Sequence, residues 1–530
     1  MDKWHLYSEF NNGANTGGRI EYVWMFGIIG LFILLLACIN FMNLTTAKSE
    51  KRAKEVGIRK TMGSYRRELI GQFFGESLMV TFCSFLVTLV LVQLSLPIFN
   101  QLADKQISIH WANPFFWLTW LGFCLITGLI AGSYPALYLS SFEPVRALKG
   151  TFKIGRFAAM PRRILVVLQF SVSVILIIGT ITVFKQVQFT KDRPVGYNPQ
   201  GLLQIEMKTP AVHQHFDVVR NDLLASGAIV EMAESGSPLT EIRSNYGGLD
   251  WTGKDPNMRD NFGYIPVGPT FGRTAGWKII DGRDFSEDVA SDSTGMILNE
   301  SAVAYMGLKH PVGEIIRWGK NYKVIGVVKN MVMTSPHDPI KPTLFCRLHW
   351  TGEMITIRIN PAASASQAIA KIRDVFKRYD PESPFDYQFT DKEYARKFGD
   401  GERIGKLAAV FSAFAIFICC IGLFGMATFV AEQRIKEIAV RKVLGASVFG
   451  LWTLLSKEFV TLVLIALGVA VPFAYYFMSD WLLNYNYRTE LSWWIFALTA
   501  SVALLITLLT VSIQSLKAAL TNPVNSLRSE

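Results

Sequence analysis

The stretch KRAKEVGIRKTMG, residues 51–63, returns as QRIKEIAVRKVLG at residues 433–445, and each copy follows a long apolar run. Six residues of the first copy recur 382 positions later. They are Arg52, Lys54, Glu55, Arg59, Lys60 and Gly63, matched by Arg434, Lys436, Glu437, Arg441, Lys442 and Gly445. Glu76 and Glu458 keep the same offset. Self-similarity at a fixed offset indicates a duplicated structural unit.

Seven apolar runs are long enough to cross a bilayer, whose hydrocarbon core of about 30 Å needs about 20 residues of helix. They cover about residues 22–45, 73–96, 115–139, 164–184, 405–430, 451–478 and 493–514. Half of the 530 residues are hydrophobic and only 18% are charged. The sequence therefore predicts a polytopic α-helical membrane protein with seven spans.

The repeated stretches divide these spans into two copies of a three-helix unit. We assign residues 22–141 to the first repeat, 142–163 to a cytoplasmic linker, 164–186 to a linking transmembrane helix and 403–530 to the second repeat. Both copies begin and end on the same sides of the membrane, so the repeats are parallel and not inverted.

The net charge of +11 is concentrated in alternate connections between the spans. The connection after the first span holds eight Lys and Arg residues, whereas the next one, about residues 97–113, holds only Lys105. Loops rich in Lys and Arg stay in the cytoplasm. We therefore expect residues 1–21 and 187–402 to lie outside and the C-terminus inside. The basic surplus indicates membrane topology and not a nucleic-acid partner.

The polar segment 187–402 is long enough to fold as a domain of its own. Strands are indicated by LLQIEM, GMILNES, YKVIGVV and EMITIRI, and helices by HQHFDVVRNDLLAS and SASQAIAKIRDVFKRY. This mixture predicts one extracytoplasmic α+β domain.

Each basic stretch is expected to form a short cytoplasmic helix that starts where a span ends and closes at a glycine in the left-handed conformation. Its Arg and Lys side chains would be available to a partner. The alternative is a positively charged anchor that contacts only lipid headgroups. The glutamate and the glycine held in register favour a protein partner, because headgroup attraction requires neither.

The sequence contains no recognisable catalytic site. The spans are nearly free of the ionisable residues that ion-driven carriers place at the bilayer centre. The nearest approach to a phosphate-binding loop, GTFKIGRF from Gly150, lacks the Lys-Ser/Thr ending, and no His-Glu-x-x-His motif occurs. His213 and His215 are expected to be exposed, and IIDGRDFSED to be a turn with a local ion pair. We predict no catalytic residue, no metal and no cofactor in this chain, so any energy source lies on another polypeptide.

Three amides are the notable polar groups within the spans: Asn40, Asn43 and Gln169. Amides in lipid seek partners on neighbouring helices, and small residues such as those in LITGLIAGS and CCIGLFGMA allow helices to approach closely. We expect intramembrane packing contacts, with a substrate path as the alternative.

The sequence resembles the FtsX-like, MacB-type permeases of ABC transporters, in the style of the duplicated permeases of Bacteroidetes-type bacteria. The resemblance rests on ACINFMNLTTAKSEKRAKEVGIRKTMGSYRRELIGQF, GSYPALYLSSFEPVRALKG, RRILVVLQFSVSV, IIDGRDF, ILNESAVAYMGL, YKVIGVVKN and CIGLFGMATFVAEQRIKEIAVRKVLGAS. It implies a bacterial inner-membrane protein with residues 187–402 as a periplasmic MacB-like core domain.

The resemblance also implies a partner and a mechanism. The twelve repeated residues would dock a separate nucleotide-binding ATPase, which carries ATP and Mg, and a periplasmic adaptor or a second permease chain could join the complex. Motion of the external domain would serve export or mechanotransmission. Alternatives are regulation of a periplasmic partner and an inactive fragment. Complete duplicated members resemble eight-helix proteins, so we expect residues 1–21 to be the tail of a missing first periplasmic domain.

Overall fold

The computed structural model describes residues 7, 9–11, 14–18, 20–140, 160–336, 338–349 and 352–520. Within these ranges, the described side chains exclude those of residues 9–11, 14–17, 46–55, 57, 135, 138, 139, 161, 400, 436, 518 and 519. The chain forms two compact units. The helical unit comprises Met1–Lys185, Gly401–Trp481 and Glu490–Glu530, and the α+β unit comprises Gln186–Asp400 and Leu482–Thr489.

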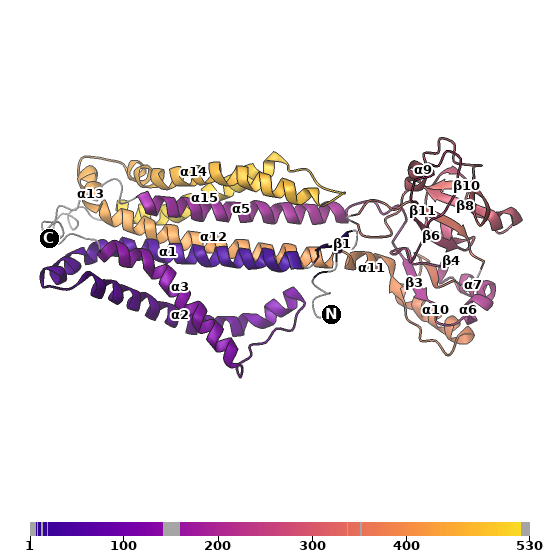
Figure 1. Ribbon diagram of the computed structural model, residues 1–530, viewed down its shortest axis with the longest axis horizontal. Helices are drawn as coiled ribbons and strands as arrows, with labels where there is room; N and C mark the ends of the chain where they lie inside the picture. The colour runs from indigo at the N-terminus through magenta and orange to yellow at the C-terminus, as the bar shows by residue number, and fades with distance from the viewer. Residues whose placement is uncertain are drawn as a thin grey trace. The chain divides into compact units, whose positions relative to one another are not determined.

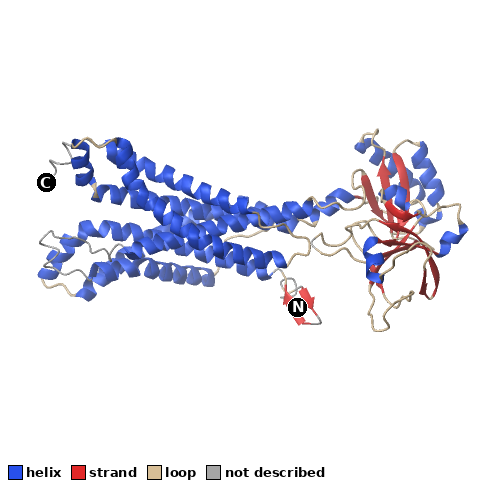
Figure 2. Ribbon diagram, turned by 90° about the horizontal axis from the view of Figure 1, so that it is seen from above, coloured by secondary structure: helices blue, strands red, loops and turns tan. Residues whose placement is uncertain are grey.

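Among the residues that the structure describes, seven helices carry segments that are long and apolar enough to cross a membrane, which confirms the predicted fold class (Figure 1). They are α1 (Ile20–Thr61), α2 (Arg66–Ala103), α3 (Pro114–Ser140), α5 (Met160–Lys191), α12 (Gly399–Gln433), α14 (Val448–Leu483) and α15 (Trp493–Leu520). The short helix α13 (Ile435–Val443) lies between α12 and α14. Strands β1 (Glu9–Asn11) and β2 (Ala14–Gly17) form a separate antiparallel pair before α1 (Figure 2).

The first repeat packs α3 against α2 through glycines. A Cβ atom added to Gly132 would lie 2.8 Å from Cβ of Ser77, and one on Gly128 would lie 2.7 Å from Cδ2 of Leu78. Two glycines four residues apart let helix backbones approach closely in lipid, where van der Waals contact replaces the hydrophobic effect as the driving force. The small residues of LITGLIAGS therefore serve helix packing, as predicted.

The second repeat packs around the linking helix. Val166, Phe170, Val174 and Ile178 of α5 are buried in one apolar cluster with residues of α12, α14 and α15. Ser171 of α5 donates a hydrogen bond of 3.3 Å to the carbonyl of Ala466 in α14. The linking helix is thus part of the core of the second repeat.

The α+β unit is built on a sheet of eleven strands with the order β13-β3-β12-β4-β6-β11-β8-β10-β7, to which β5 adds beside β6 and β9 beside β10. The strands are β3 (Leu202–Glu206), β4 (Ile229–Ser235), β5 (Ser244–Tyr246), β6 (Phe262–Val267), β7 (Ile279–Gly282), β8 (Gly295–Asn299), β9 (Ile315–Trp318), β10 (Lys320–Val328), β11 (Thr343–Arg347), β12 (Met354–Ile359) and β13 (Gln388–Phe389). The pairs β6–β11 and β8–β10 are parallel, and the other pairs are antiparallel.

Helices cover the sheet in two groups. In one group, α7 and α10 bury Val219, Leu223, Ile372 and Phe376 against β3, β4 and β12. In the other, Ala302 and Met306 of α9 pack against β6, β8, β10 and β11. The helices of the unit are α6 (Ala211–Gln214), α7 (Phe216–Ala225), α8 (Phe271–Ala275), the 3₁₀ turn η1 (Ala290–Thr294), α9 (Glu300–Met306), α10 (Ala365–Tyr379) and α11 (Thr390–Arg396).

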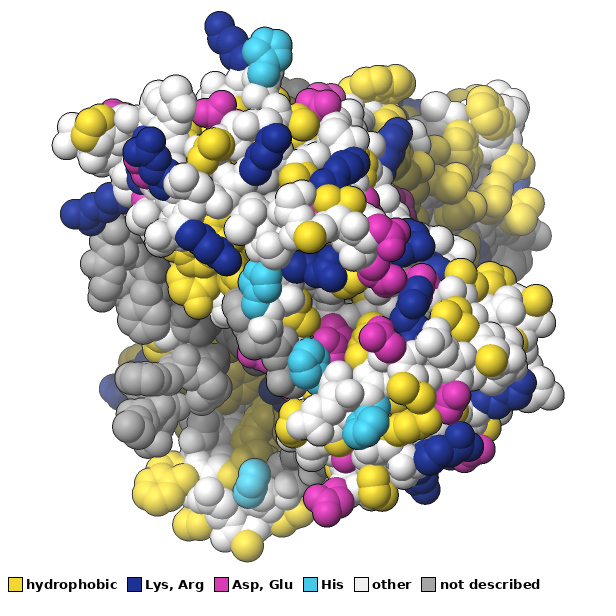
Figure 3. Space-filling model, turned by 90° about the vertical axis from the view of Figure 1, so that its right-hand side faces the viewer, with side chains coloured by type: hydrophobic (Ala, Val, Ile, Leu, Met, Phe, Trp, Pro, Cys, Tyr) yellow, Lys and Arg dark blue, Asp and Glu magenta, His cyan; other side chains and the backbone are white. Residues whose placement is uncertain are grey.

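The predicted elements of this unit are present, and others were missed. The four predicted strands are β3, β8, β10 and β12, and the two predicted helices are α10 and the pair α6–α7, which is interrupted at His215. The missed strands include β6, which contains Pro266, a residue type disfavoured inside sheets, and β4, whose alternation is hidden because it is buried on both faces. The face shown in Figure 3 mixes Lys and Arg with Asp, Glu and His, as expected for a surface in water.

The α2–α3 contact gives a direct test of the glycine packing. Replacing Gly132 by leucine places new atoms inside the space of Ser77, so we expect a destabilisation of about 1–3 kcal/mol. The measurement is the midpoint of thermal unfolding in detergent. Gly122→Leu on the same helix is the control, because a Cβ there meets nothing within 4 Å. Equal midpoints for the two variants would refute the packing role.

Candidate functional site

The two repeated stretches end in the same backbone structure. At the end of α1, the amide of Gly63 donates to the carbonyl of Lys60 at 3.1 Å and that of Ser64 to Arg59 at 3.0 Å. At the end of α13, the matching bonds join Gly445 to Lys442 at 3.1 Å and Ala446 to Arg441 at 2.9 Å. The glycines have φ of 98° and 90°. Both ends are therefore Schellman caps, in which only glycine is unstrained.

One buried aliphatic side chain holds each stretch against the start of the following span. Val56 packs with Leu69 and Phe73 of α2, and all three are buried. Ile438 packs with Leu451 and Leu455 of α14, the residues 382 positions later, and these are buried as well. Burying a side chain of this size contributes about 1.5–3 kcal/mol. The orientation of each stretch is thus fixed by an apolar contact that both repeats share.

In the first repeat, the basic residues near the cap are held by polar groups of α2 and α3. Nη1 of Arg59 donates to Oε1 of Gln72 at 2.7 Å, and Nζ of Lys60 donates to the carbonyl of Ser140 at 2.7 Å. Partial burial and the nearby Arg66 guanidinium lower the pKa of Lys60. Arg52, Lys54 and Glu55 lie on the helical backbone of α1, and their side chains are outside the described ones.

In the second repeat, the charges pair differently. Nη2 of Arg441 lies 2.7 Å from Oε1 of Glu437 one turn earlier on α13. Arg434 pairs with Oε2 of Glu458 on α14 at 3.2 Å, and Arg163 of α5 pairs with Oε1 of the same residue at 2.6 Å. Lys442 is half-buried, and the side chain of Lys436 is outside the described ones. The repeated residues therefore share a backbone frame but not their side-chain partners.

The prediction of two separate short helices holds only for the second repeat. Arg434 interrupts the helix between α12 and α13, with φ of −96° and ψ of 10°, while its guanidinium is paired with Glu458. In the first repeat α1 runs without interruption from the span to Thr61. The backbone at Arg52 therefore stays helical where its counterpart turns, so the sequence repeat is not a strict repeat of helix boundaries.

Two exposed apolar side chains on each stretch were not anticipated. Ile58 and Met62 are 43% and 83% exposed, and their counterparts Val440 and Leu444 are 49% and 80% exposed. Within each pair the residues are four positions apart and so lie on one face of a helix. The signal was present in the sequence, since both positions are apolar in both copies, but nothing in the pattern distinguishes an exposed face from a buried one.

Two of the three predicted intramembrane amides, Asn40 and Gln169, lie close to Gly422 of α12. A Cβ atom on Gly422 would lie 2.7 Å from Oδ1 of Asn40 in α1 and 3.1 Å from Nε2 of Gln169 in α5. Asn40, Asn43 and Gln169 are all buried. The glycine thus leaves room for two amides from different helices, and their role in packing remains a prediction.

The segments that continue the membrane helices are tied together within the α+β unit. The side chain of Gln186, at the end of α5, accepts from the amide of Thr489 at 2.8 Å and donates to the carbonyl of Tyr487 at 2.8 Å. Phe189 stacks on Tyr487 with centroids 4.6 Å apart, and the Arg193 guanidinium lies 4.5 Å from the same ring. The α14–α15 connection, placed in the second repeat by sequence, is therefore held by the last turns of α5 and by Arg193 just after it.

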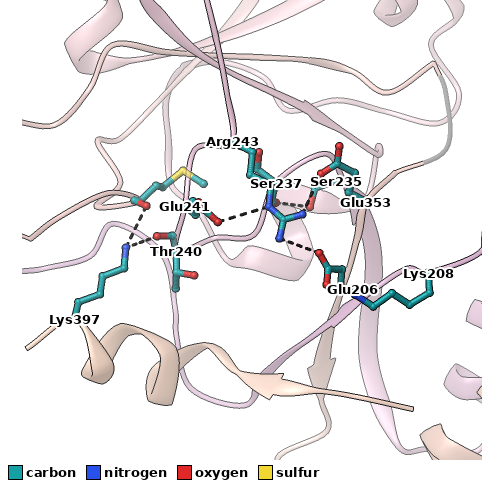
Figure 4. A network of polar contacts seen from close by, with 10 residues as sticks. Glu206, Lys208, Ser235, Ser237, Thr240, Glu241, Arg243, Glu353 and Lys397 are labelled. Carbon is teal, nitrogen blue, oxygen red and sulfur yellow. Dashed lines mark hydrogen bonds and ion pairs between the residues drawn. The ribbon is translucent and has the colours of Figure 1, made fainter. Parts of the chain in front are cut away.

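The segment that leads into α12 is fastened to the same unit (Figure 4). Nζ of Lys397 donates to the carbonyls of Thr240 and, at 2.8 Å, Thr334, and burial lowers the pKa of this ammonium group. Phe398 is buried with Val332 and Tyr394. Nearby, the Arg243 guanidinium lies 3.0 Å from Glu353 and 3.2 Å from Glu206. The contacts of Lys397 and Phe398 hold the chain where it passes from the α+β unit into α12.

Two polar motifs of the external segment have structural contacts. His213 is not simply exposed, because its Nδ1 lies 2.8 Å from Oε2 of the buried Glu234, whose pKa burial raises. In IIDGRDFSED, Gly282 turns the chain with φ of 69°, and Arg283 pairs with Asp292 at 2.6 Å, beyond the motif. Among the described residues, no group of three or more His, Cys, Asp or Glu side chains is placed to hold a metal.

Two family models match the chain. That for the FtsX-like permease C-terminal matches residues 27–144 and again 409–523, and that for the MacB-like periplasmic core domain matches residues 164–375. The first match falls on the two repeats and supports the duplication.

Curated relatives match over about a quarter of the chain. The chain is 32% identical over 122 residues to "Macrolide export ATP-binding/permease protein MacB" of Bdellovibrio bacteriovorus, covering 23% of this chain and 18% of the relative. It is 30% identical over 124 residues to "Pyoverdine export ATP-binding/permease protein PvdT" of Pseudomonas putida, with the same coverage. It is 28% identical over 126 residues to "Uncharacterized ABC transporter permease YknZ" of Bacillus subtilis, covering 23% of this chain and 30% of the relative. The matches thus span less than a third of each relative's length.

A search of solved structures matches the periplasmic region of MacB from Actinobacillus actinomycetemcomitans. The TM-score is 0.29 with 16% identity, over 39% of this chain and 96% of that chain.

The shared caps predict a shared response to substitution. Gly63→Ala and Gly445→Ala place a Cβ in the left-handed region, which costs about 1–2 kcal/mol. We expect faster hydrogen–deuterium exchange of residues 58–64 and 440–446 in the respective variants. Gly71→Ala, at a helical glycine with nothing within 4 Å, is the control and should leave both segments unchanged. Unaltered exchange in the two cap variants would show that the caps do not fix these ends.

Because Tyr487 contacts Phe189 and Arg193, we expect its removal to loosen only the connection between α14 and α15. Tyr487→Ala removes the stack on Phe189 and the cation–π contact with Arg193, together about 1–2 kcal/mol. We expect hydrogen–deuterium exchange of the backbone amides of residues 482–489 to become about tenfold faster. Asn486→Ala, at an exposed position of the same connection, should have little effect. If residues 482–489 exchange their amide hydrogens at the same rate in both variants, Tyr487 does not hold the connection.

Proposed function

This chain belongs to the FtsX-like permeases of the MacB type, the membrane subunits of ABC transporters, and we propose that its two repeated stretches each dock one nucleotide-binding subunit. The stretches, residues 52–63 and 434–445, are hereafter called the coupling segments. The chain is a multi-pass membrane protein, and ATP hydrolysis is assigned to the partner, with ATP and Mg bound there.

The observation that carries this proposal is the matched surface of the two coupling segments. Each presents an exposed apolar pair, Ile58 with Met62 or Val440 with Leu444, beside basic residues and above a buried anchor. A lipid anchor needs only charge, whereas a rigid, capped helix end with an apolar pair at a fixed place suits a groove on a protein. Two equivalent surfaces suit two copies of one partner.

The proposed orientation follows from charge. The coupling segments lie in connections that are rich in Lys and Arg, which we assign to the cytoplasm together with the C-terminus. The α+β unit then lies on the periplasmic side of the bacterial inner membrane, with a second permease chain or a periplasmic adaptor as further candidate partners.

Motion would reach the α+β unit through α5 and α12. Beyond the first turn of α5, neither helix contains proline, whereas α2 and α14 carry Pro97 and Pro472 in their interiors. Interior proline breaks a backbone hydrogen bond and kinks a helix. The 35 residues of α12 form one continuous helix about 50 Å long, which ends at the second coupling segment. We infer that α12 transmits displacement of this segment along the chain, as export or mechanotransmission requires.

Removing the apolar pair tests the docking. Met62→Asp and Leu444→Asp each replace an apolar contact worth about 1.5–3 kcal/mol, so we expect affinity for the ATPase at that segment to fall by about 10–100-fold. The measurement is co-purification of the ATPase subunit with a tagged chain. Each single variant should retain about half of the ATPase, and the double variant almost none.

The control for this experiment is Ile107→Asp, which places the same charge at an exposed residue in the connection between α2 and α3. It should not alter the ATPase yield. Normal yield with the double variant would refute docking through the coupling segments.

A further inference from the structure

An apolar groove lies between α5 and α14, wholly within the helical unit. It encloses about 1000 Å³, at the upper end of the range of about 300–1,000 Å³ usual for ligand sites. Ile164, Val167 and Leu168 of α5 form one wall, and Leu462, Ile465 and Val469 of α14 form the other. The groove follows the length of the helices for several turns, so its shape suits an extended apolar ligand.

One end of the groove is charged. Arg163, Arg434, Lys457 and Glu458 all line it there. The two oxygens of Glu458 hold Arg163 at 2.6 Å and Arg434 at 3.2 Å, which fixes both guanidinium groups at the rim. Lys457 is exposed, and no hydrogen bond or ion pair joins its ammonium group to a residue that the structure describes. Three cations against one carboxylate leave an excess of two positive charges.

This site belongs to the second repeat alone. The residue 382 positions before Lys457 is Gly75, and that before Ile465 is Cys83. Arg163 lies in the first turn of the linking helix α5, outside both repeats. The excess charge is therefore not part of the duplicated surface, and the docking of an ATPase does not explain it.

We propose that this groove binds one anionic phospholipid, with its phosphate between Arg163 and Lys457 and its acyl chains along Ile164, Leu168, Ile465 and Val469. An apolar wall that ends in unneutralised cations complements an amphiphile with an anionic head. A transmembrane helix of another protein would cover the wall but would leave Lys457 without a counter-charge in a low-dielectric setting. With the coupling segments in the cytoplasm, the lipid comes from the inner leaflet.

The test uses the full chain reconstituted in phosphatidylcholine bilayers that contain a trace of spin-labelled lipid. The label is carried either by phosphatidylglycerol or by phosphatidylcholine, and electron spin resonance gives the fraction of each that the protein immobilises. A cation near the headgroups contributes about 1 kcal/mol to binding of an anionic lipid. We therefore expect Lys457→Gln and Arg163→Gln each to lower the preference for phosphatidylglycerol about fivefold.

The matched control is Lys517→Gln, which removes a cation from α15 at the same end of the bundle but outside the groove. The preference of this variant for phosphatidylglycerol over phosphatidylcholine should remain near that of the wild-type chain. An equal small loss in all three variants would mean general attraction to the surface and would overturn the proposal. Loss of lipid preference with normal ATPase co-purification separates this site from the docking surfaces.

A second variant tests the groove without changing charge. Val469→Trp places a bulky ring in the path proposed for the acyl chains, and we expect the immobilised fraction of labelled phosphatidylglycerol to fall to that of phosphatidylcholine. Leu464→Trp, at an exposed residue of α14 outside the groove, is the control and should have no such effect. If Val469→Trp displaces neither label, a protein helix or nothing occupies the groove, and the lipid site is refuted.

Discussion

The contact between one buried aliphatic residue and the start of the next span underlies the arrangement of the coupling segments. Val56 and Ile438 each fill a small apolar cluster with two residues of α2 or α14. Because a helix outside the bilayer receives no support from lipid, this contact and the glycine cap fix its direction. The exposed apolar pair then takes the same place in both repeats.

The two repeats have diverged in the way they use this frame. The first passes from span to coupling segment in one continuous helix, whereas the second turns at Arg434. The turn brings Arg434 to Glu458, to which Arg163 of the linking helix also binds. One carboxylate thus joins α5, α14 and the second coupling segment. Movement of that segment would therefore displace Glu458 and Arg163 at the charged end of the proposed lipid groove.

At the other end of the helices, polar and aromatic contacts replace the apolar ones. Gln186, Phe189 and Arg193 bind the α14–α15 connection, while Lys397 and Phe398 hold the segment that precedes α12. Water competes for hydrogen bonds outside the bilayer, so side-chain amides there must be buried to act as fixed links. Gln186 is buried, and its side-chain amide both accepts and donates a hydrogen bond within the α+β unit.

The sequence by itself determined the seven spans, the duplication and the presence of an α+β domain, because hydrophobic length, fixed offsets and strand periodicity are local properties of the chain. It also located both capping glycines and the three intramembrane amides. Only the tertiary structure decided that Ile58 and Met62 are exposed while Val56 is buried, since all three are apolar and lie within two turns of helix. It alone brought Arg163, Arg434 and Lys457 to one rim, because these residues lie far apart in the chain or belong to different helices, and their proximity follows from packing.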